Sequence, residues 1–228
     1  MDTEDISDKP EYIQLLLEQK KRLQDGQLLK GQKPQQMMHR DQLVMQFQRR
    51  LMINSQVSDR RGLLTTFLPP AYTPCATSLQ EPQKIMIADL VLETHHRGTD
   101  MMLRTITPAY RLNAVMAIVE DDNNDVLELV LYHQPEESES RAQDILPMGQ
   151  ILFVKEPYLK LMSSGSHGLR SDHLSDVRPV DIFELSEPIP AGWQLTTKET
   201  IRSTSTDTWR LRGNDSFNNL NYFDAIKQ

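Results

Sequence analysis

The sequence has little cysteine and few glycines, and both shortages exclude kinds of chemistry. Cys75 is the single cysteine among 228 residues, so the chain has neither an internal disulfide nor a zinc module built from several cysteines. The nine glycines form neither a dinucleotide-binding G-x-G-x-x-G motif nor a Walker A loop, and a G-x-S-x-G nucleophile elbow is absent as well. We therefore expect no cofactor, no metal ion and no small-molecule substrate.

Long apolar runs and an excess of positive charge are also missing. No stretch approaches the roughly 18 apolar residues that a membrane-spanning helix needs. Residues 1–9 are polar and acidic, unlike a signal or transit peptide, and we expect an intracellular protein, cytoplasmic or nuclear. The net charge of −7 argues against nucleic acid as a partner, because such binding relies on Lys and Arg to neutralise phosphates.

Two amphipathic helices are expected in an N-terminal extension over residues 1–54. Asp8-Lys9-Pro10-Glu11 has the residues of an N-cap, an early proline and a capping box. The apolar positions near one face of the first helix are Ile13, Leu16, Leu17 and Leu23, and those of the second are Leu43, Val44, Phe47 and Leu51. We prefer a partly exposed extension that packs weakly on the following domain; the alternative is an amphipathic docking element for another chain.

Residues 55–83 are rich in proline, serine and threonine, a composition typical of an extended linker. From residue 84 the pattern changes to short β-prone runs separated by turn residues. The expected strands are Met101–Thr107, Ala114–Glu120, Val126–His133, Ile151–Val154 and Gly168–Leu174, with a helix at Ser138–Leu146 between the third and the fourth. This β-β-β-α-β-β order predicts a mainly β, α+β fold with flanking helices: an OB-like five-stranded barrel over residues 84–185.

The second and third expected strands, over residues 114–120 and 126–133, are apolar at almost every position. Both of their faces are therefore expected to be covered, one by the barrel interior and one by a helix or loop. The alternative function for such a barrel is binding of single-stranded nucleic acid, which uses aromatic and cationic side chains on this face. The candidates are Tyr132 for stacking and Arg104, Arg111, Lys155, Lys160 and Arg170 for a small basic groove.

Histidines and paired acids give no pattern of a metal or catalytic site. His95 and His96 are adjacent, and neighbouring side chains on a strand point to opposite faces, so a metal ion would need His133 or His173 from elsewhere in the chain. We interpret the pair as turn residues before Gly98. Acid pairs such as Asp121-Asp122 lie in polar turns. We therefore predict that the protein is not an enzyme.

The most specific pattern comes at the end of the chain, over residues 207–228, after a second linker over residues 186–206. It resembles the first helix and the start of the second helix of a tetratricopeptide (TPR) repeat, a unit of about 34 residues. The positions that match the helix packing are Trp209, Gly213, Phe217, Tyr222 and Ala225. Arg212 and Ser216 depart from the repeat pattern, and the chain stops roughly two thirds of the way through the repeat.

A wider resemblance covers most of the chain from about residue 10, and it is to the N-terminal region of fungal proteins that carry TPR repeats followed by a SET domain. The stretches that carry it are Ala88–Gly98, Asn113–Glu120, Leu131–Gln134, Val154–Lys160 and Leu169–Val177. The resemblance implies a SET domain that methylates protein lysines with S-adenosylmethionine and a TPR array that binds peptides. No SET motif is found in these 228 residues, so we name no catalytic or cofactor-binding residue.

One pair of binding residues is implied by the TPR resemblance. In TPR domains that hold the C-terminal carboxylates of chaperones, a cation and an asparagine one helical turn apart bind the peptide end. The matching positions here are Arg210 and Asn214. We therefore interpret the chain as a non-catalytic protein-interaction or scaffold fragment with an unidentified protein partner, and we expect no binding of S-adenosylmethionine.

Overall fold

The computed structural model describes residues 9–35, 37–57, 71–75, 82–162 and 165–180, together with residues 190 and 193, and no side chain of residues 54–57. The chain divides into two units, Met1–Pro190 and Ala191–Gln228. Nearly everything described belongs to the first unit, which is mainly β with a few helices, as the sequence predicts at this level. The predicted TPR segment 207–228, including Arg210 and Asn214, lies outside the described residues.

The two N-terminal helices are α1, Pro10–Gln27, and α2, Arg40–Val57. Proline stands in the first turn of α1, where its missing N–H costs nothing. The N-cap residue is Lys9, whose side chain makes no capping hydrogen bond, and Asp8 of the expected capping box lies outside the described residues. Among the helices that the structure describes, none is long and apolar enough to cross a membrane.

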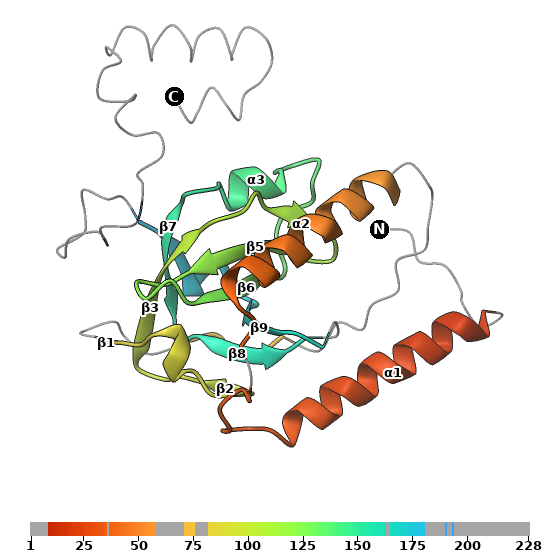
Figure 1. Cartoon of the computed structure of the whole chain (residues 1–228), viewed down its shortest axis with the longest axis horizontal. Coiled ribbons are helices and arrows are strands. Elements are labelled where there is room, and N and C mark those ends of the chain that lie inside the picture. The colour runs from red at the N-terminus through yellow and green to blue at the C-terminus, as the bar shows by residue number, and fades with distance from the viewer. Residues whose placement is uncertain are drawn as a thin grey trace, which may run out of the picture. The chain divides into compact units, whose positions relative to one another are not determined.

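The strands of the described part form one sheet (Figure 1). They are β1 Gln83–Lys84, β2 Thr94–His95, β3 Thr99–Thr105, β4 Tyr110–Arg111, β5 Val115–Glu120, β6 Val126–Leu131, β7 Ile151–Lys155, β8 Tyr158–Leu161, β9 His167–Ser171 and β10 Val177–Pro179. Short helical turns lie between them: η1 Ile87–Asp89, α3 Ala142–Ile145 and η2 Leu174–Asp176.

The sheet is larger than the expected five-stranded barrel. It contains ten strands in the open order β10-β7-β3-β5-β6-β9-β8-β2, with β1 paired to β3 and β4 paired to β5. The five expected runs all contribute strands, but the other five strands have two to four residues each, too short to show a hydrophobic period. Most pairs are antiparallel, whereas β1 pairs with β3 and β6 pairs with β9 in parallel.

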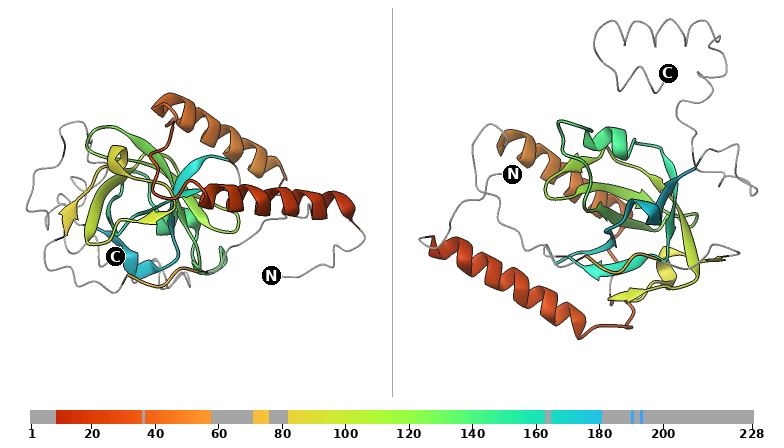
Figure 2. Two further views of the ribbon diagram at one scale, coloured as in Figure 1. Left: turned by 90° about the horizontal axis from the view of Figure 1, so that it is seen from below. Right: turned by 180° about the vertical axis from the view of Figure 1, so that it is seen from behind.

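The two apolar strands are covered on both faces, as predicted. Every residue of β5 and β6 is buried. Alternate residues, among them Val119 and Leu129, belong to the main core, and those between them, among them Ile118 and Val130, pack against Phe47 of α2. Figures 1 and 2 show α2 lying along this face of the sheet. The second helical stripe is therefore buried locally.

Buried carboxylates of the sheet connect it to the helices. Arg40 of α2 and Arg104 of β3 both bind Glu120, with 2.9 Å between Arg40 Nη2 and Glu120 Oε2. Arg50 Nη2 lies 3.0 Å from Glu128 Oε1. Burying these carboxylates without such partners would cost several kcal/mol each.

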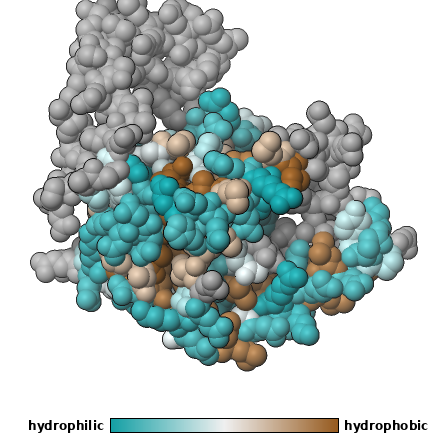
Figure 3. All heavy atoms as spheres, in the orientation of Figure 1, coloured by the Kyte–Doolittle hydropathy of each residue, from teal (hydrophilic) through white to brown (hydrophobic). Residues whose placement is uncertain are grey.

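The first helix has much less contact with the sheet. Gly26 is its one buried residue, and it lies against Leu161 of β8. Its apolar side chains Ile13, Leu15 and Leu17 are exposed, and Figure 3 shows patches of hydrophobic surface where α1 lies. Of the apolar face predicted for this helix, Ile13 and Leu17 are exposed, whereas Leu16 and Leu23 are half-buried. This agrees with the preferred, partly exposed extension.

Candidate functional site

Three neighbouring strands bring polar and aromatic side chains into a row. His95 of β2 is the cross-strand partner of Tyr158 of β8, and Tyr158 is the partner of Arg170 of β9. Side chains on one face of paired strands are direct neighbours. The rings of His95 and Tyr158 are stacked, with centroids 4.3 Å apart and 10° between their planes.

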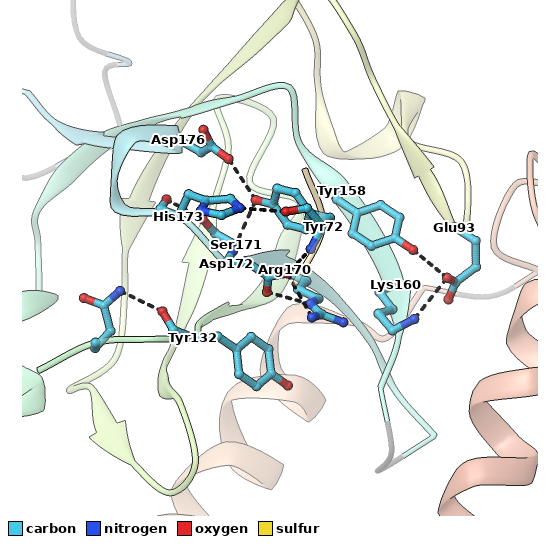
Figure 4. A network of polar contacts seen from close by, with 11 residues as sticks. Tyr72, Glu93, Tyr132, Tyr158, Lys160, Arg170, Ser171, Asp172, His173 and Asp176 are labelled. Carbon is cyan, nitrogen blue, oxygen red and sulfur yellow. Dashed lines mark hydrogen bonds and ion pairs between the residues drawn. The ribbon is translucent and has the colours of Figure 1, made fainter. Parts of the chain in front are cut away.

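Tyr72, from the segment predicted as a linker, lies against this row (Figure 4). Its ring meets His95 edge-on at 4.4 Å between centroids, His173 at 5.2 Å and Tyr158 at 6.0 Å. Edge-to-face contacts of this kind add to the stabilisation that comes from burying the rings. Three rings from the sheet and the turn after β9 therefore hold the ring of one tyrosine.

The polar atoms of Tyr72 are bound by the same turn. Its backbone N–H donates to Asp172 Oδ2 at 2.9 Å, and its carbonyl accepts from His173 Nε2 at 2.7 Å. Its hydroxyl donates to Asp176 Oδ2 at 3.0 Å and accepts from the Asp172 N–H at 3.2 Å. The site thus binds the main chain and the phenol of a single residue.

Two buried ion pairs support the site. Arg170 Nε and Nη2 donate to Asp172 Oδ1 and Oδ2 at 2.7 and 2.9 Å, a bidentate arrangement that fixes the carboxylate. On the other side of Tyr158, Glu93 accepts from the Tyr158 hydroxyl at 2.8 Å and pairs with Lys160 at 3.1 Å. Both cations are therefore neutralised by buried acids.

Burial changes the proton affinities of the rings. It is the main cause that raises the pKa values of the Tyr72 and Tyr158 phenols above their ordinary range, so both hydroxyls stay protonated at neutral pH. Burial, followed by the charge of Arg97, lowers the pKa of His95. The rings of Tyr72, Tyr158 and His95 are therefore shifted toward their neutral forms.

Cys75 follows three residues after Tyr72. Its carbonyl accepts a hydrogen bond from Lys155 Nζ at 3.1 Å. Burial, with a smaller contribution from a hydrogen bond to Glu156, raises the pKa of its thiol to about 12. A thiol that stays protonated is a poor nucleophile, so Cys75 has no sign of catalytic activation.

The adjacent histidines have separate surroundings. His96 donates from Nδ1 to the Pro157 carbonyl at 2.9 Å and accepts at Nε2 from the Val91 N–H at 3.0 Å. Both of its ring nitrogens are used within the fold, which supports the interpretation as a turn residue. His95 lies in strand β2 and not in a turn, and the ring of Tyr72 contacts both His95 and His173.

Each of the five cations predicted for a basic groove is engaged within the fold. Arg104 binds Glu120, Arg111 binds Glu137, Lys155 binds the Cys75 carbonyl, Lys160 binds Glu93 and Arg170 binds Asp172. Tyr132, the predicted stacking residue, has the Arg170 guanidinium 5.1 Å from its ring centroid.

Sequence reasoning missed Tyr72, Asp172 and Asp176 as site residues. Tyr72 stands between two prolines, in Pro70-Ala71-Tyr72-Thr73-Pro74. A lone aromatic in a Pro-rich stretch was a usable signal, since such a residue has little reason to be there unless it is buried. The two acids gave no signal, because isolated aspartates near turns are common.

Comparison with known proteins gives one informative match. No family model matches the chain. A protein of Gibberella zeae named "Methyltransferase" is 38% identical over 196 residues, which cover 85% of this chain and 24% of that protein. The chain thus spans about a quarter of the length of this relative.

Among solved structures, the chain resembles Schizosaccharomyces pombe Pot1pC bound to single-stranded DNA. The TM-score is 0.35 and the identity 12%, over 45% of this chain and 89% of that one. A likeness this weak supports no conclusion about the ligand.

The prediction that the protein is not an enzyme is contradicted. It rested on the absence of catalytic motifs in these 228 residues, but a relative named a methyltransferase aligns with most of the chain at 38% identity. Motif absence was a weak argument, because a chain that spans a quarter of an enzyme's length has no need to contain its motifs.

Proposed function

We propose that this chain is the protein-binding part of a methyltransferase of the type that combines TPR repeats with a SET domain, which methylates protein lysines. The observation that carries the proposal is the alignment of 85% of the chain with a quarter of a protein named a methyltransferase. The resemblance of Ala88–Gly98, Leu169–Val177 and the TPR-like segment 207–228 to fungal TPR-and-SET proteins supports the finer assignment.

The strand pairing supports an OB-type barrel as the framework. Only Glu156 and Pro157 separate β7 from β8, and β7 pairs with β3 whereas β8 pairs with β9. If residues 151–161 are counted as one bent strand, the circuit β3-β5-β6-β9-β8/β7-β3 closes. Five-stranded closure with a Greek-key connection is the arrangement of the OB-fold.

A protein partner fits the described surface better than nucleic acid does. In OB-folds strands 2 and 3 carry the face that binds oligonucleotides. The corresponding strands are β5 and β6, and α2 packs over one of their faces while the core covers the other. The cations of the β8–β9 region are paired with buried acids, which leaves little positive charge for phosphates.

In this proposal the TPR-like segment adds a second contact with protein. Trp209, Gly213 and Phe217 would pack the helix pair, while Arg210 and Asn214 would bind the end of a peptide. A TPR unit needs neighbouring repeats to bury its apolar face, so this contact belongs to the longer protein.

The proposal is tested in the Gibberella zeae methyltransferase, by methyl transfer from labelled S-adenosylmethionine to lysines of acceptor proteins. Three forms are compared: the intact protein, a form without the segment that aligns with this chain, and a form in which this chain replaces that segment. We expect deletion to raise KM for the acceptor at least tenfold without changing the affinity for S-adenosylmethionine, and replacement to restore most of the loss. Unchanged acceptor kinetics after deletion, or transfer to no protein lysine in any form, would overturn the proposal.

A further inference from the structure

We propose that the site around Tyr72 is a binding site for extended peptides that contain an unphosphorylated tyrosine, and that the chain's own Ala71–Cys75 occupies it. The contacts to Tyr72 are of the kind that a separate peptide would make: one main-chain N–H, one carbonyl, one ring and one hydroxyl. This inference concerns the sheet alone and does not depend on any methyltransferase role.

The occupying segment takes no part in the sheet ladder. Ala71–Cys75 is neither helix nor strand, and Ala71, Thr73 and Pro74 are exposed. Hydrogen bonds to Tyr72 and to the carbonyl of Cys75 hold it in place. Side chains of β8, β9 and the following turn therefore bind it much as a groove binds a peptide.

The site is preorganised without its occupant. Asp172 is oriented by the bidentate pair with Arg170, Tyr158 by its hydrogen bond to Glu93, and His95 by stacking on Tyr158. None of these three contacts involves Tyr72. A site that keeps its shape when empty loses little entropy on binding and accepts a peptide in trans.

The hydroxyl contacts define which residue the site accepts. The phenol both donates to Asp176 and accepts from the Asp172 N–H, so phenylalanine leaves a buried carboxylate and a buried N–H without their partner. Both acids are nearly inaccessible, with 2–3% of their surface exposed. A phosphate on the tyrosine would meet the buried carboxylate of Asp176, so phosphotyrosine is excluded.

The main experiment measures binding of a fluorescent peptide, Pro69–Ser78 with Cys75 replaced by serine, to the full chain by anisotropy. The Tyr72→Ala chain, whose site is vacated, should bind the peptide at least tenfold more tightly than the natural chain, in which the segment competes in cis. Thr73→Ala removes an exposed side chain and keeps Tyr72, so this matched control should behave as the natural chain does. A folded Tyr72→Ala chain that binds the peptide no better than the Thr73→Ala chain would show that Tyr72 is only a structural anchor.

Peptide variants test the selectivity of the site. Replacing the peptide's tyrosine with phenylalanine should weaken binding at least tenfold, and phosphotyrosine should abolish it. Equal binding of the three peptides would overturn the assignment. If Tyr72→Ala does not fold, Tyr72→Phe keeps the ring and weakens only the hydroxyl contacts. It should then bind the tyrosine peptide more tightly than the natural chain, and equal affinities would again refute the inference.

Discussion

Glu93 shows how single residues hold this fold together. It adopts a left-handed backbone conformation, φ 53°, which is uncommon outside glycine. The contacts of its carboxylate offset the cost of this backbone conformation. The carboxylate accepts hydrogen bonds from the Gln27 side chain, the Tyr158 hydroxyl and the Leu161 N–H, and it pairs with Lys160. One residue thus connects α1, β8 and the ring cluster.

The Glu93→Gln variant should therefore lose about 3 kcal/mol of unfolding free energy, because it leaves the buried Lys160 ammonium without a carboxylate. Chemical denaturation followed by circular dichroism measures the loss. Adding Lys160→Met should recover part of it, whereas Glu11→Gln, an exposed change in α1, should have no measurable effect. A loss of unfolding free energy below about 1 kcal/mol would contradict the prediction that the Glu93–Lys160 pair stabilises the fold.

His95 makes the stability depend on pH. Its pKa is lowered in the folded chain, so between that pKa and the unfolded value near 6.5 the unfolded chain binds more protons. Stability is then complete above about pH 6.5 and declines as the pH falls through the folded pKa. Denaturation between pH 7.5 and 5.5 should show this decline, and His95→Gln should reduce it. A residual slope is expected from His167, whose pKa burial also lowers.

The reactivity of the Cys75 thiol indicates whether the segment Ala71–Cys75 occupies the site around Tyr72. With its pKa raised to about 12, the thiol should react with iodoacetamide at pH 8 roughly a thousandfold more slowly than in the urea-unfolded chain, because so little thiolate is present. Tyr72→Ala should accelerate labelling by releasing the segment, and Thr73→Ala should not. Fast labelling of the natural chain would mean that the segment leaves its site readily.

At the level of elements, α2 packs closely on the sheet, whereas α1 buries far fewer side chains against it. Phe47 of α2 is completely buried and meets the ring of Tyr110 edge-on at 5.0 Å. Leu17 of α1 is 61% exposed. The two helices have the same length, yet only α2 has the apolar face of β5 and β6 to cover.

Phe47→Ala should accordingly destabilise the chain by about 3–5 kcal/mol through the cavity it leaves. Leu17→Ala should change stability by less than about 0.5 kcal/mol. Thermal unfolding of the two variants, side by side with the natural chain, measures both. Similar effects from the two changes would contradict the different burial of the helices.

Strands are predictable from the sequence where their apolar runs are long. The runs in β3, β5 and β6 were recognised from their apolar content, and the covered faces of β5 and β6 followed from it. Strand β8 was missed because Glu156-Pro157 resembles the end of a strand. The site around Tyr72 was missed for a different reason: it joins residue 72 to residues 172–176, and a contact across 100 positions leaves no local pattern.

At the level of the whole molecule, the described sheet engages its buried cations within the fold. Glu120, Glu93 and Asp172 pair with Arg104, Lys160 and Arg170, which leaves little positive charge for phosphates. The sheet also holds the chain's own segment Ala71–Cys75 through contacts to the main chain and side chain of Tyr72. Both observations support the proposed role in binding protein.

Two parallel titrations, one with protein and one with nucleic acid, test protein binding most directly. The purified chain is titrated with an acceptor protein of the Gibberella zeae methyltransferase and, separately, with a single-stranded oligonucleotide, at 50 and 200 mM salt. We predict that the acceptor binds at both salt concentrations and that the oligonucleotide binds at neither. Oligonucleotide binding that falls at least tenfold between the two concentrations, without binding of the acceptor, would contradict the proposed role.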